Sequence, residues 1–274
     1  MERDFEVLAS GEWPHGSVHT VFDSTATRKT DAHIESCIAE RWDQSERLAA
    51  AQGKLLFAGP LCRLVKHESS PDRLRLFLGP TDYREFLGTN MQWQRIESHT
   101  GAAELPHYLS NAIAVCAAIR TSDGKLVAGR RSQRVMEHPG RWHVPGGNVD
   151  PRTHVREGSI DVFRAILAEL QEELGCSDDR VSLMCVSLIR PLDSRKPELL
   201  FLADVRYTWP ELLDLPKDAE HDELLCIDDR PEELLGFLRR EGNLFAPSGK
   251  AAFLRYGAIR YGREWESLAR SDRV

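Results

Sequence analysis

Three glutamates crowded near the end of one predicted helix are the residues of this sequence best suited to chemistry. Glu169, Glu172 and Glu173 stand in the stretch AELQEELG, which Gly175 ends. On a helix that advances about 100° per residue, Glu173 falls about 40° from Glu169, and Glu172 about 60° to its other side. Carboxylates so placed repel one another, and the negative end of the helix dipole adds to the cost. A divalent cation would offset both effects, and Mg²⁺ in particular binds one or two carboxylates together with substrate phosphates.

The context of these glutamates favours a metal site over an ordinary solvated face. Taken alone, the pattern E-x-x-E-E is typical of charged outer faces of helices. Here a predicted strand ends in Pro145-Gly146-Gly147 before the helix, and the helix itself ends in Leu174-Gly175-Cys176. We therefore predict that the acidic face binds a cation.

Apolar periodicity predicts the elements that must position this face. Aliphatic residues three and four apart line one side of a helix predicted over residues 155–174, and the glutamates lie on another side. A second helix is predicted over residues 31–52, whereas residues 89–106 form a polar segment without clear periodicity. The remaining predictions are strands over residues 54–68, 73–79, 111–120, 126–132, 141–147, 181–189 and 198–207, and helices over residues 233–241 and 249–259.

Strands interleaved with helices predict an α/β or α+β fold, with a mixed β-sheet between layers of helices. The polar segment places a domain boundary near residue 105. We expect a smaller N-terminal α+β domain over residues 1–104 and a second domain, which holds the acidic helix, over residues 105–274.

Charge and composition limit the classes of partner. The formal net charge is −7 and the isoelectric point about 5.8, which argues against nucleic acid but not against a small phosphorylated ligand. The N-terminal MERDFEVLAS is charged where a signal peptide would be apolar, and the most apolar stretch, Ala112–Ile119, is too short to cross a bilayer. The six cysteines form no C-x-x-C pair. These features predict a cytoplasmic protein without a membrane partner, and they leave the oligomeric state open.

The glycine turn and the acidic helix together resemble the signature of the Nudix hydrolase family. That signature is a glycine, a spacer, and a helix carrying R-E-U-x-E-E-x-G-U, where U is a bulky aliphatic residue. Residues 168–176, AELQEELGC, match the helix part, and RWHVPGGNVDP supplies the preceding strand and turn. The resemblance implies a Nudix-type mixed sheet sandwiched by helices.

Two departures from the signature stand out. Its arginine, which braces the glutamates, is Ala168 here, and Arg164 one turn earlier is only a substitute by position. The spacer between Gly147 and Glu169 is longer than usual, and Glu157 is the nearest counterpart of the signature's early glutamate. The departures are compatible with a divergent branch or with a decayed, non-catalytic copy.

Three further patches resemble a Nudix branch that cleaves UDP-glucose and UDP-galactose. They are GPTDYREFLGTN at residues 79–90, RRS at residues 130–132 and APSGKAAFLRYGAIRY at residues 246–261. That branch also carries an extra N-terminal domain and lacks the bracing arginine. The resemblance therefore implies Mg²⁺-dependent hydrolysis of a UDP-sugar to UMP and a sugar 1-phosphate, with Mn²⁺ as an alternative ion and a nucleotide sugar as the small-molecule partner.

The resemblance also assigns roles to individual residues. Glu169, Glu172 and Glu173 would hold the metal together with the Gly147 carbonyl, and Glu169 and Glu173 are the predicted catalytic pair. The general base stays open among Glu157, Glu198, Asp222 and Glu223. The predicted substrate contacts are Arg130, Arg131, Ser248 and Lys250 for the phosphates, and Tyr83, Arg84, Gly88, Thr89 and Asn90 for the nucleoside.

Several of these residues have a structural alternative. Strand alternation lets at most one of Arg130 and Arg131 face the site, and Ser248 would serve equally as a helix cap. Spacing alone makes Tyr83 a core residue and the GTN stretch a helix end. His143 and His221 have no partners at zinc spacing, so we expect both to be structural.

Two other functions compete with the leading one. A Nudix hydrolase could act on ADP-ribose, NADH or coenzyme A. A catalytically silent module could sense a nucleotide sugar, which the missing arginine favours and the three retained glutamates oppose.

Overall fold

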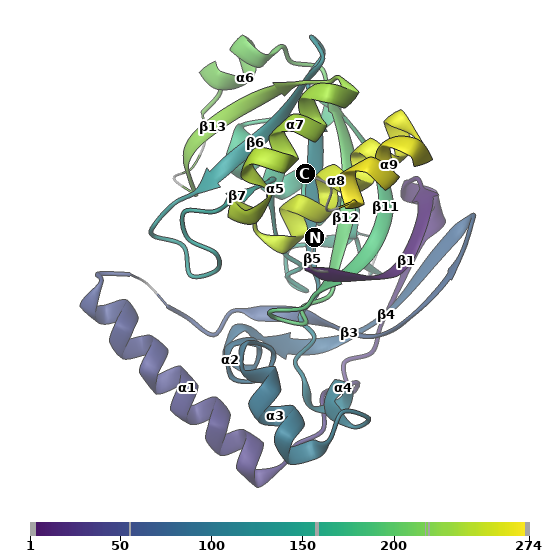
Figure 1. The fold of residues 1–274 in the computed structure, drawn as a ribbon. Helices are drawn as coiled ribbons and strands as arrows, with labels where there is room; N and C mark the ends of the chain where they lie inside the picture. The colour runs from purple at the N-terminus through teal and green to yellow at the C-terminus, as the bar shows by residue number, and fades with distance from the viewer. Residues whose placement is uncertain (1–3, 55, 157–158, 217, 219, 272–274) are drawn as a thin grey trace.

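A twisted mixed β-sheet with helices on both faces forms the larger part of the molecule (Figure 1). The computed structural model describes residues 4–54, 56–156, 159–216, 218 and 220–271. The sheet runs in the order β1-β11-β12-β5-β6-β13, with β7 beside β6 and β8 beside β5. Only β12 and β5 pair in parallel along this path. These strands are β1 (Phe5–Trp13), β5 (Ala114–Arg120), β6 (Lys125–Arg131), β7 (Trp142–His143), β8 (Gly146–Asn148), β11 (Val181–Pro191), β12 (Glu198–Val205) and β13 (His221–Asp228).

The central strand β5 shows why the sheet is covered on both sides. Successive side chains of a strand point to opposite faces. Val115, Ala117 and Ile119 pack in the core that contains α5, and Cys116 and Ala118 pack in the core that contains α7, α8 and α9. Both faces of β5 are therefore apolar. The helices of this part are α5 (Val162–Leu174), α6 (Trp209–Asp214), α7 (Pro231–Glu241), α8 (Pro247–Tyr261) and α9 (Arg263–Arg270).

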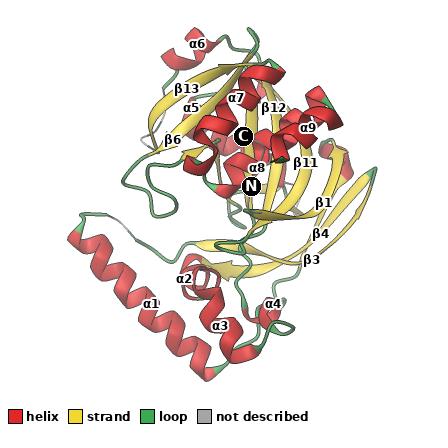
Figure 2. Ribbon diagram, in the orientation of Figure 1, coloured by secondary structure: helices red, strands yellow, loops and turns green. Residues whose placement is uncertain are grey.

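A smaller α+β unit lies below the large sheet in the views of Figures 1 and 2. Its three strands run in the order β2-β4-β3, and Leu74, Leu76 and Leu78 of β4 extend the α5 core. Its elements are β2 (Val18–Phe22), α1 (Ala32–Ala51), β3 (Pro60–Ser70), β4 (Arg73–Asp82), α2 (Tyr83–Gly88), α3 (Trp93–Thr100) and α4 (Leu105–Tyr108).

The predicted fold class is confirmed, since helices flank a large mixed sheet. The predicted boundary at residue 105 is not a clean division in space. Strand β1 comes from the N-terminal segment but pairs with β11 of the large sheet. The Trp13 indole donates to the Ser70 carbonyl at 3.0 Å, which ties β1 to the smaller sheet. The two parts thus share strands and core.

Three predicted elements differ in the structure. The acidic helix begins at Val162 rather than at residue 155, because the Asp161 carboxylate caps it and a short hairpin of β9 (Val155–Arg156) and β10 (Ser159–Ile160) precedes it. The segment 89–106 contains α3, whose Ile96 is buried against α1. The strand predicted from residue 54 begins at Pro60. Strands β1, β2 and β13 were missed.

Within the described residues, no helix combines the length and the apolar character that crossing a bilayer would need.

Candidate active site

A cavity of about 570 Å³ opens between the smaller unit and the large sheet. From the smaller unit it is lined by Leu56, Phe57, Gly59, Pro60, Leu61 and Tyr83. Residues of α5, of β8 and of the loop that follows β6 also line it. The cavity therefore needs both parts of the chain, and it contains most of the predicted metal ligands.

The acidic face of α5 forms one wall. Glu169 and Glu172 line the cavity, and Glu173 lies deeper, with an Oε1 that accepts the Gly146 N–H at 2.8 Å. The Glu169 carboxylate lies against Gly147, where a Cβ would come within 2.0 Å of Oε1, so a larger residue there would displace that carboxylate. Gly175 in a left-handed conformation ends the helix just beyond the glutamates. The glycine turn and the acidic helix thus meet, as the pattern predicted.

The glutamates at the cavity have raised pKa values, because burial and their mutual repulsion destabilise their anionic forms. Burial first, and then the charge of Glu172, raises the pKa of Glu169 to about 8. Burial and the neighbouring Glu169 raise the pKa of Glu173 well above its usual range. Burial also raises the pKa of Glu220, which lines the cavity beside these residues and was missed. Its sequence position does not distinguish Glu220 from the neighbouring acidic residues Asp218, Asp222 and Glu223.

The donor set fits a hard divalent cation such as Mg²⁺. Carboxylate oxygens from Glu169, Glu172 and Glu173 and the carbonyl of Gly147 are the ligand type that Mg²⁺ prefers. Among the residues that the structure describes, no three acidic, histidine or cysteine side chains already stand in ligating geometry.

The stability of the metal-free protein is expected to fall as the pH rises from about 7 to about 8. Folded Glu169 keeps its proton up to about pH 8, whereas an unfolded glutamate loses it near pH 4.5. The folded state therefore binds more protons in this window, and raising the pH favours unfolding. Burial lowers the pKa values of His143 and His221 below 6.5. These histidines make the folded state more stable as the pH rises, but that gain ends near pH 6.5, below this window.

Thermal unfolding in EDTA, measured in small pH steps, tests this expectation. Glu169→Gln should flatten the decline in Tm, and Glu232→Gln on α7 should leave it unchanged. Parallel curves for wild type and Glu169→Gln across this window would contradict the raised pKa.

Basic side chains line the same cavity as the acidic face of α5. Arg131 donates from Nε to the Glu137 carbonyl at 2.9 Å, and the Lys196 ammonium lies 3.1 Å from the Glu137 carboxylate. The cations that line the cavity are Arg131, Arg134, Arg152 and Lys196. Lys196 and Arg134 were missed in the sequence, because neither stands in a recognisable motif.

Arg130 does not reach the cavity. Its guanidinium lies over the Trp142 ring at 5.8 Å and 3.8 Å from the Glu223 carboxylate, and half of its side chain is exposed. Only one of the two adjacent arginines therefore lines the cavity, in agreement with strand alternation.

The two phosphate ligands predicted at the start of α8, Ser248 and Lys250, lie in different places. Ser248 lines the cavity, with its Oγ 3.5 Å from His143 Nε2. It does not cap the helix, since Ala246 is the N-cap residue and Pro247 opens the helix. Lys250 is buried and pairs with Asp4 at 2.6 Å, so it points to the N-terminal segment and does not line the cavity.

The candidates for the general base are separated by their positions. Glu198 lines the cavity, and its pKa is raised by burial. Asp222 accepts a hydrogen bond from the Gln133 N–H at 3.2 Å, and Glu223 is half exposed beside Arg130; neither lines the cavity. Glu157 lies outside the described residues. Glu198 and the newly found Glu220 are thus the carboxyl groups best placed for this role.

The nucleoside patch is mostly structural. Tyr83 lines the cavity, but Arg84 is exposed outside it. Gly88 packs on α1, where a Cβ would lie 2.6 Å from Ile38 Cα. Asn90 is buried, accepts the Asn111 N–H at 2.8 Å, and donates to the Ser194 carbonyl at 3.2 Å. The polar groups offered by the GTN stretch are therefore used within the fold rather than at the cavity.

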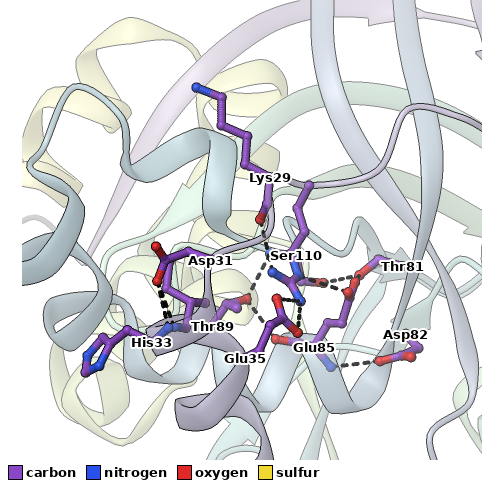
Figure 3. A network of polar contacts seen from close by, with 11 residues as sticks. Lys29, Asp31, His33, Glu35, Thr81, Asp82, Glu85, Thr89 and Ser110 are labelled. Atoms are coloured by element: carbon purple, nitrogen blue, oxygen red, sulfur yellow. Dashed lines mark hydrogen bonds and ion pairs between the residues drawn. The ribbon is translucent and has the colours of Figure 1, made fainter.

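Figure 3 shows the network in which this patch takes part. Thr81 donates to the Glu85 carboxylate at 2.7 Å and lies 2.7 Å from the Ser110 hydroxyl. Thr89 accepts the Ser110 N–H at 2.9 Å. The Arg28 guanidinium, whose side chain is 3% exposed, pairs with Glu85 at 2.9 Å. This network fixes the position of α2, and with it Tyr83 at the cavity.

Residues 110–239 match the family profile described as NUDIX domain. This confirms the resemblance seen in the acidic helix and the glycine turn. The matched region contains every predicted metal ligand.

Two curated relatives extend the comparison beyond that region. The chain is 34% identical over 158 residues to the uridine diphosphate glucose pyrophosphatase NUDT22 of Homo sapiens, a match that covers 50% of each protein. It is 29% identical over 219 residues to Nudix hydrolase 9 of Arabidopsis thaliana, which covers 70% of each. The chain thus spans about half the length of the human relative.

Among solved structures, the MutT protein of Methanosarcina mazei Go1 is 22% identical, with a TM-score of 0.38. The alignment covers 54% of this chain and 94% of that protein.

Proposed function

We propose that this chain hydrolyses the pyrophosphate bond of UDP-sugars such as UDP-glucose and UDP-galactose in the presence of Mg²⁺, giving UMP and a sugar 1-phosphate. The observation that carries the proposal is the presence of acidic and basic side chains in one cavity. Its glutamates are suited to a cation, and its arginines and Lys196 are suited to phosphates. A diphosphate bridged to a divalent cation presents both kinds of charge.

The relatives support the choice of substrate. The human protein is named as a uridine diphosphate glucose pyrophosphatase, and proteins of the same name in Mus musculus and Bos taurus are 36% and 39% identical to the matched parts of this chain. The cavity also offers aromatic side chains for a base. Tyr83 lines it, as does Phe57, which is 72% exposed.

The acidic and the basic side chains of the cavity have different roles in the proposed reaction. Glu169, Glu172 and Glu173 would hold Mg²⁺ together with the Gly147 carbonyl. The bound ion would neutralise the phosphates and lower the pKa of the attacking water. Arg131 and the other basic residues that line the cavity would orient the diphosphate and stabilise the charge of the leaving phosphate. Glu198 and Glu220 are the candidates to accept the proton of the water.

A substrate panel tests the proposal. The wild-type chain is incubated with UDP-glucose, UDP-galactose, ADP-ribose, NADH and coenzyme A, with Mg²⁺ or with EDTA, and the products are separated by anion-exchange chromatography. We expect UMP and sugar 1-phosphate from the UDP-sugars, and no product in EDTA. If only ADP-ribose, NADH or coenzyme A is hydrolysed, the proposed UDP-sugar substrate is wrong and that compound takes its place. Binding of UDP-glucose without turnover of any compound would instead identify a nucleotide-sugar sensor.

A further inference from the structure

Polar side chains from the first part of the long spacer line the cavity next to the glycine turn. They are Asn148, Asp150, Arg152, Thr153 and His154. This polar segment, residues 148–154, begins directly after Gly147. Three residues of chain reach at most about 11 Å, so Asp150 lies no farther than that from Gly147. Neither the proposed metal site nor the choice of general base uses these five side chains.

Hydrogen bonds of the main chain fix the polar segment to its surroundings. The Cys62 N–H of β3 donates to the Val149 carbonyl at 2.9 Å, and the Val149 N–H donates to the Ile113 carbonyl at 3.1 Å. The His154 N–H donates to the Asp150 carbonyl at 3.1 Å, which closes the turn that follows. The polar groups are therefore held in place before a ligand binds, which lowers the entropic cost of binding.

Asp150 and Arg152 form a carboxylate–guanidinium pair at the cavity. The Arg152 guanidinium donates to Asp150 Oδ2 at 2.7 Å and to Oδ1 at 3.2 Å. The side chains of Arg152 and Asp150 are 63% and 22% exposed, so both are accessible to a further partner. Because the two charges cancel, the pair adds little attraction for phosphates, but it offers acceptor oxygens and N–H donors side by side.

A hydrogen bond at the His154 ring determines which of its nitrogens is a donor. The Asp150 N–H donates to His154 Nδ1 at 3.0 Å. A backbone N–H only donates, so Nδ1 is an acceptor and the ring is neutral, with its proton on Nε2. Burial acts in the same direction, because it lowers the pKa of His154. His154 therefore brings an N–H donor to the lining of the cavity.

Asn148 brings a buried acceptor without a partner. Strand β8 pairs Asn148 with Ala114 of β5, which fixes its backbone. Within the described residues, Asn148 Oδ1 is buried and makes no hydrogen bond. A buried acceptor without a donor is costly, and such groups in native structures call for an explanation. A hydroxyl group of a bound ligand would satisfy this oxygen.

The polar segment matches a polyhydroxylated ligand better than a base. Each hydroxyl group of a sugar both donates and accepts hydrogen bonds, and the segment offers acceptors on two side chains and donors on three. A base, in contrast, stacks on aromatic rings such as those of Tyr83 and Phe57, which line the same cavity.

We infer that the polar segment binds the sugar of a nucleoside diphosphate sugar, through hydrogen bonds from the sugar hydroxyl groups to Asn148, to the pair of Asp150 and Arg152, and to His154. The inference rests on the proposed function, since it requires the diphosphate to lie at the acidic face of α5. It assigns Arg152 to the sugar rather than to the diphosphate. The extra length of the spacer then provides the part of the chain that selects the sugar.

The binding of three small ligands without a pyrophosphate bond tests the inference. Glucose 1-phosphate, inorganic phosphate and UMP are each titrated into the protein with Mg²⁺ in a calorimeter. We expect the wild type to bind glucose 1-phosphate more tightly than phosphate. Arg152→Met should weaken glucose 1-phosphate by about 10-fold, because hydrogen bonds to charged groups are the stronger ones. Its affinities for phosphate and UMP should stay within about twofold of the wild type, since the sugar contacts alone are lost.

A second variant and a control accompany Arg152→Met. Asn148→Leu keeps the shape of the side chain but has no acceptor, and it should weaken glucose 1-phosphate by roughly fivefold. Neither substitution should lower the Tm, because the Arg152 side chain is largely exposed and Asn148 Oδ1 has no partner among the described residues. Arg239→Met on the exposed face of α7, away from the cavity, should change neither binding nor Tm.

Three results would overturn the inference. The first is wild-type affinity for glucose 1-phosphate in both variants. The second is equal weakening of glucose 1-phosphate and inorganic phosphate in Arg152→Met, which would make Arg152 a phosphate ligand. The third is weaker binding of UMP alone, which would place the nucleoside at the polar segment.

The same titrations distinguish this inference from the proposed function. A wild type that binds glucose 1-phosphate but leaves UDP-glucose intact refutes the proposed hydrolysis, and the two variants still decide whether the polar segment binds the sugar. A wild type that hydrolyses UDP-glucose but binds glucose 1-phosphate no more tightly than phosphate overturns the inference and leaves the proposed function in place.

Discussion

Glu169→Gln is expected to lower kcat/KM for UDP-glucose by about 1,000-fold or more, which corresponds to about 4 kcal/mol of transition-state stabilisation. Glu169 lies against the glycine turn and lines the cavity, and burial together with the charge of Glu172 raises its pKa to about 8, so a cation would stabilise its anionic form. Glutamine keeps the shape of the side chain but provides neither the charge nor the second ligand oxygen. Initial rates at saturating Mg²⁺, together with Mn²⁺ titration, measure the loss.

A matched glutamate away from the cavity provides the control for this experiment. Glu97→Gln on α3 makes the same chemical change in a helix of the smaller unit and should leave both the rate and Mn²⁺ binding unchanged. If Glu169→Gln keeps more than a tenth of the wild-type kcat/KM, Glu169 is not a ligand of the catalytic ion.

Arg28→Met is expected to destabilise the chain by about 2 kcal/mol, through loss of a buried charge from the network in Figure 3. The Arg28 side chain is 3% exposed and pairs with Glu85 at 2.9 Å and with Glu35 at 2.8 Å. Glu85 and Glu35 are partly exposed, so water compensates for some of the loss and the cost stays below that of a fully buried pair. Urea unfolding, followed by circular dichroism, measures the change in free energy of unfolding.

The neighbouring residue offers a direct comparison. Lys29→Met removes an ion pair with Glu104 in which both side chains are half exposed, so it should destabilise the chain much less than Arg28→Met does. The double variant Arg28→Met, Glu85→Gln should cost less than the sum of its single changes, since Glu85 then needs no cation. Equal effects of Arg28→Met and Lys29→Met would show that burial of the network contributes nothing.

Local sequence patterns predicted the acidic helix and the glycine turn well, because their geometry depends on neighbouring residues. The spacing of Glu169, Glu172 and Glu173 places them on one face of any α-helix, and Gly175 ends that helix through its own backbone conformation. The apolar strands of the central sheet were equally clear. The errors lie at the ends of the predicted elements. The acidic helix, for example, begins after its cap residue Asp161, although the apolar periodicity continues toward residue 155.

The sequence by itself thus determined the resemblance to the Nudix family, the helix that carries the carboxylates and the strands that support it. Only the tertiary structure decided which residues share the cavity with them. Lys196, Glu220 and His221 come from segments far from α5 and lie close to it through strand pairing, while Asn90 is drawn into the interior. The physical reason is that helix and strand periodicity arise from contacts between near neighbours. Burial, pKa and access to a ligand depend on what packs from distant parts of the chain.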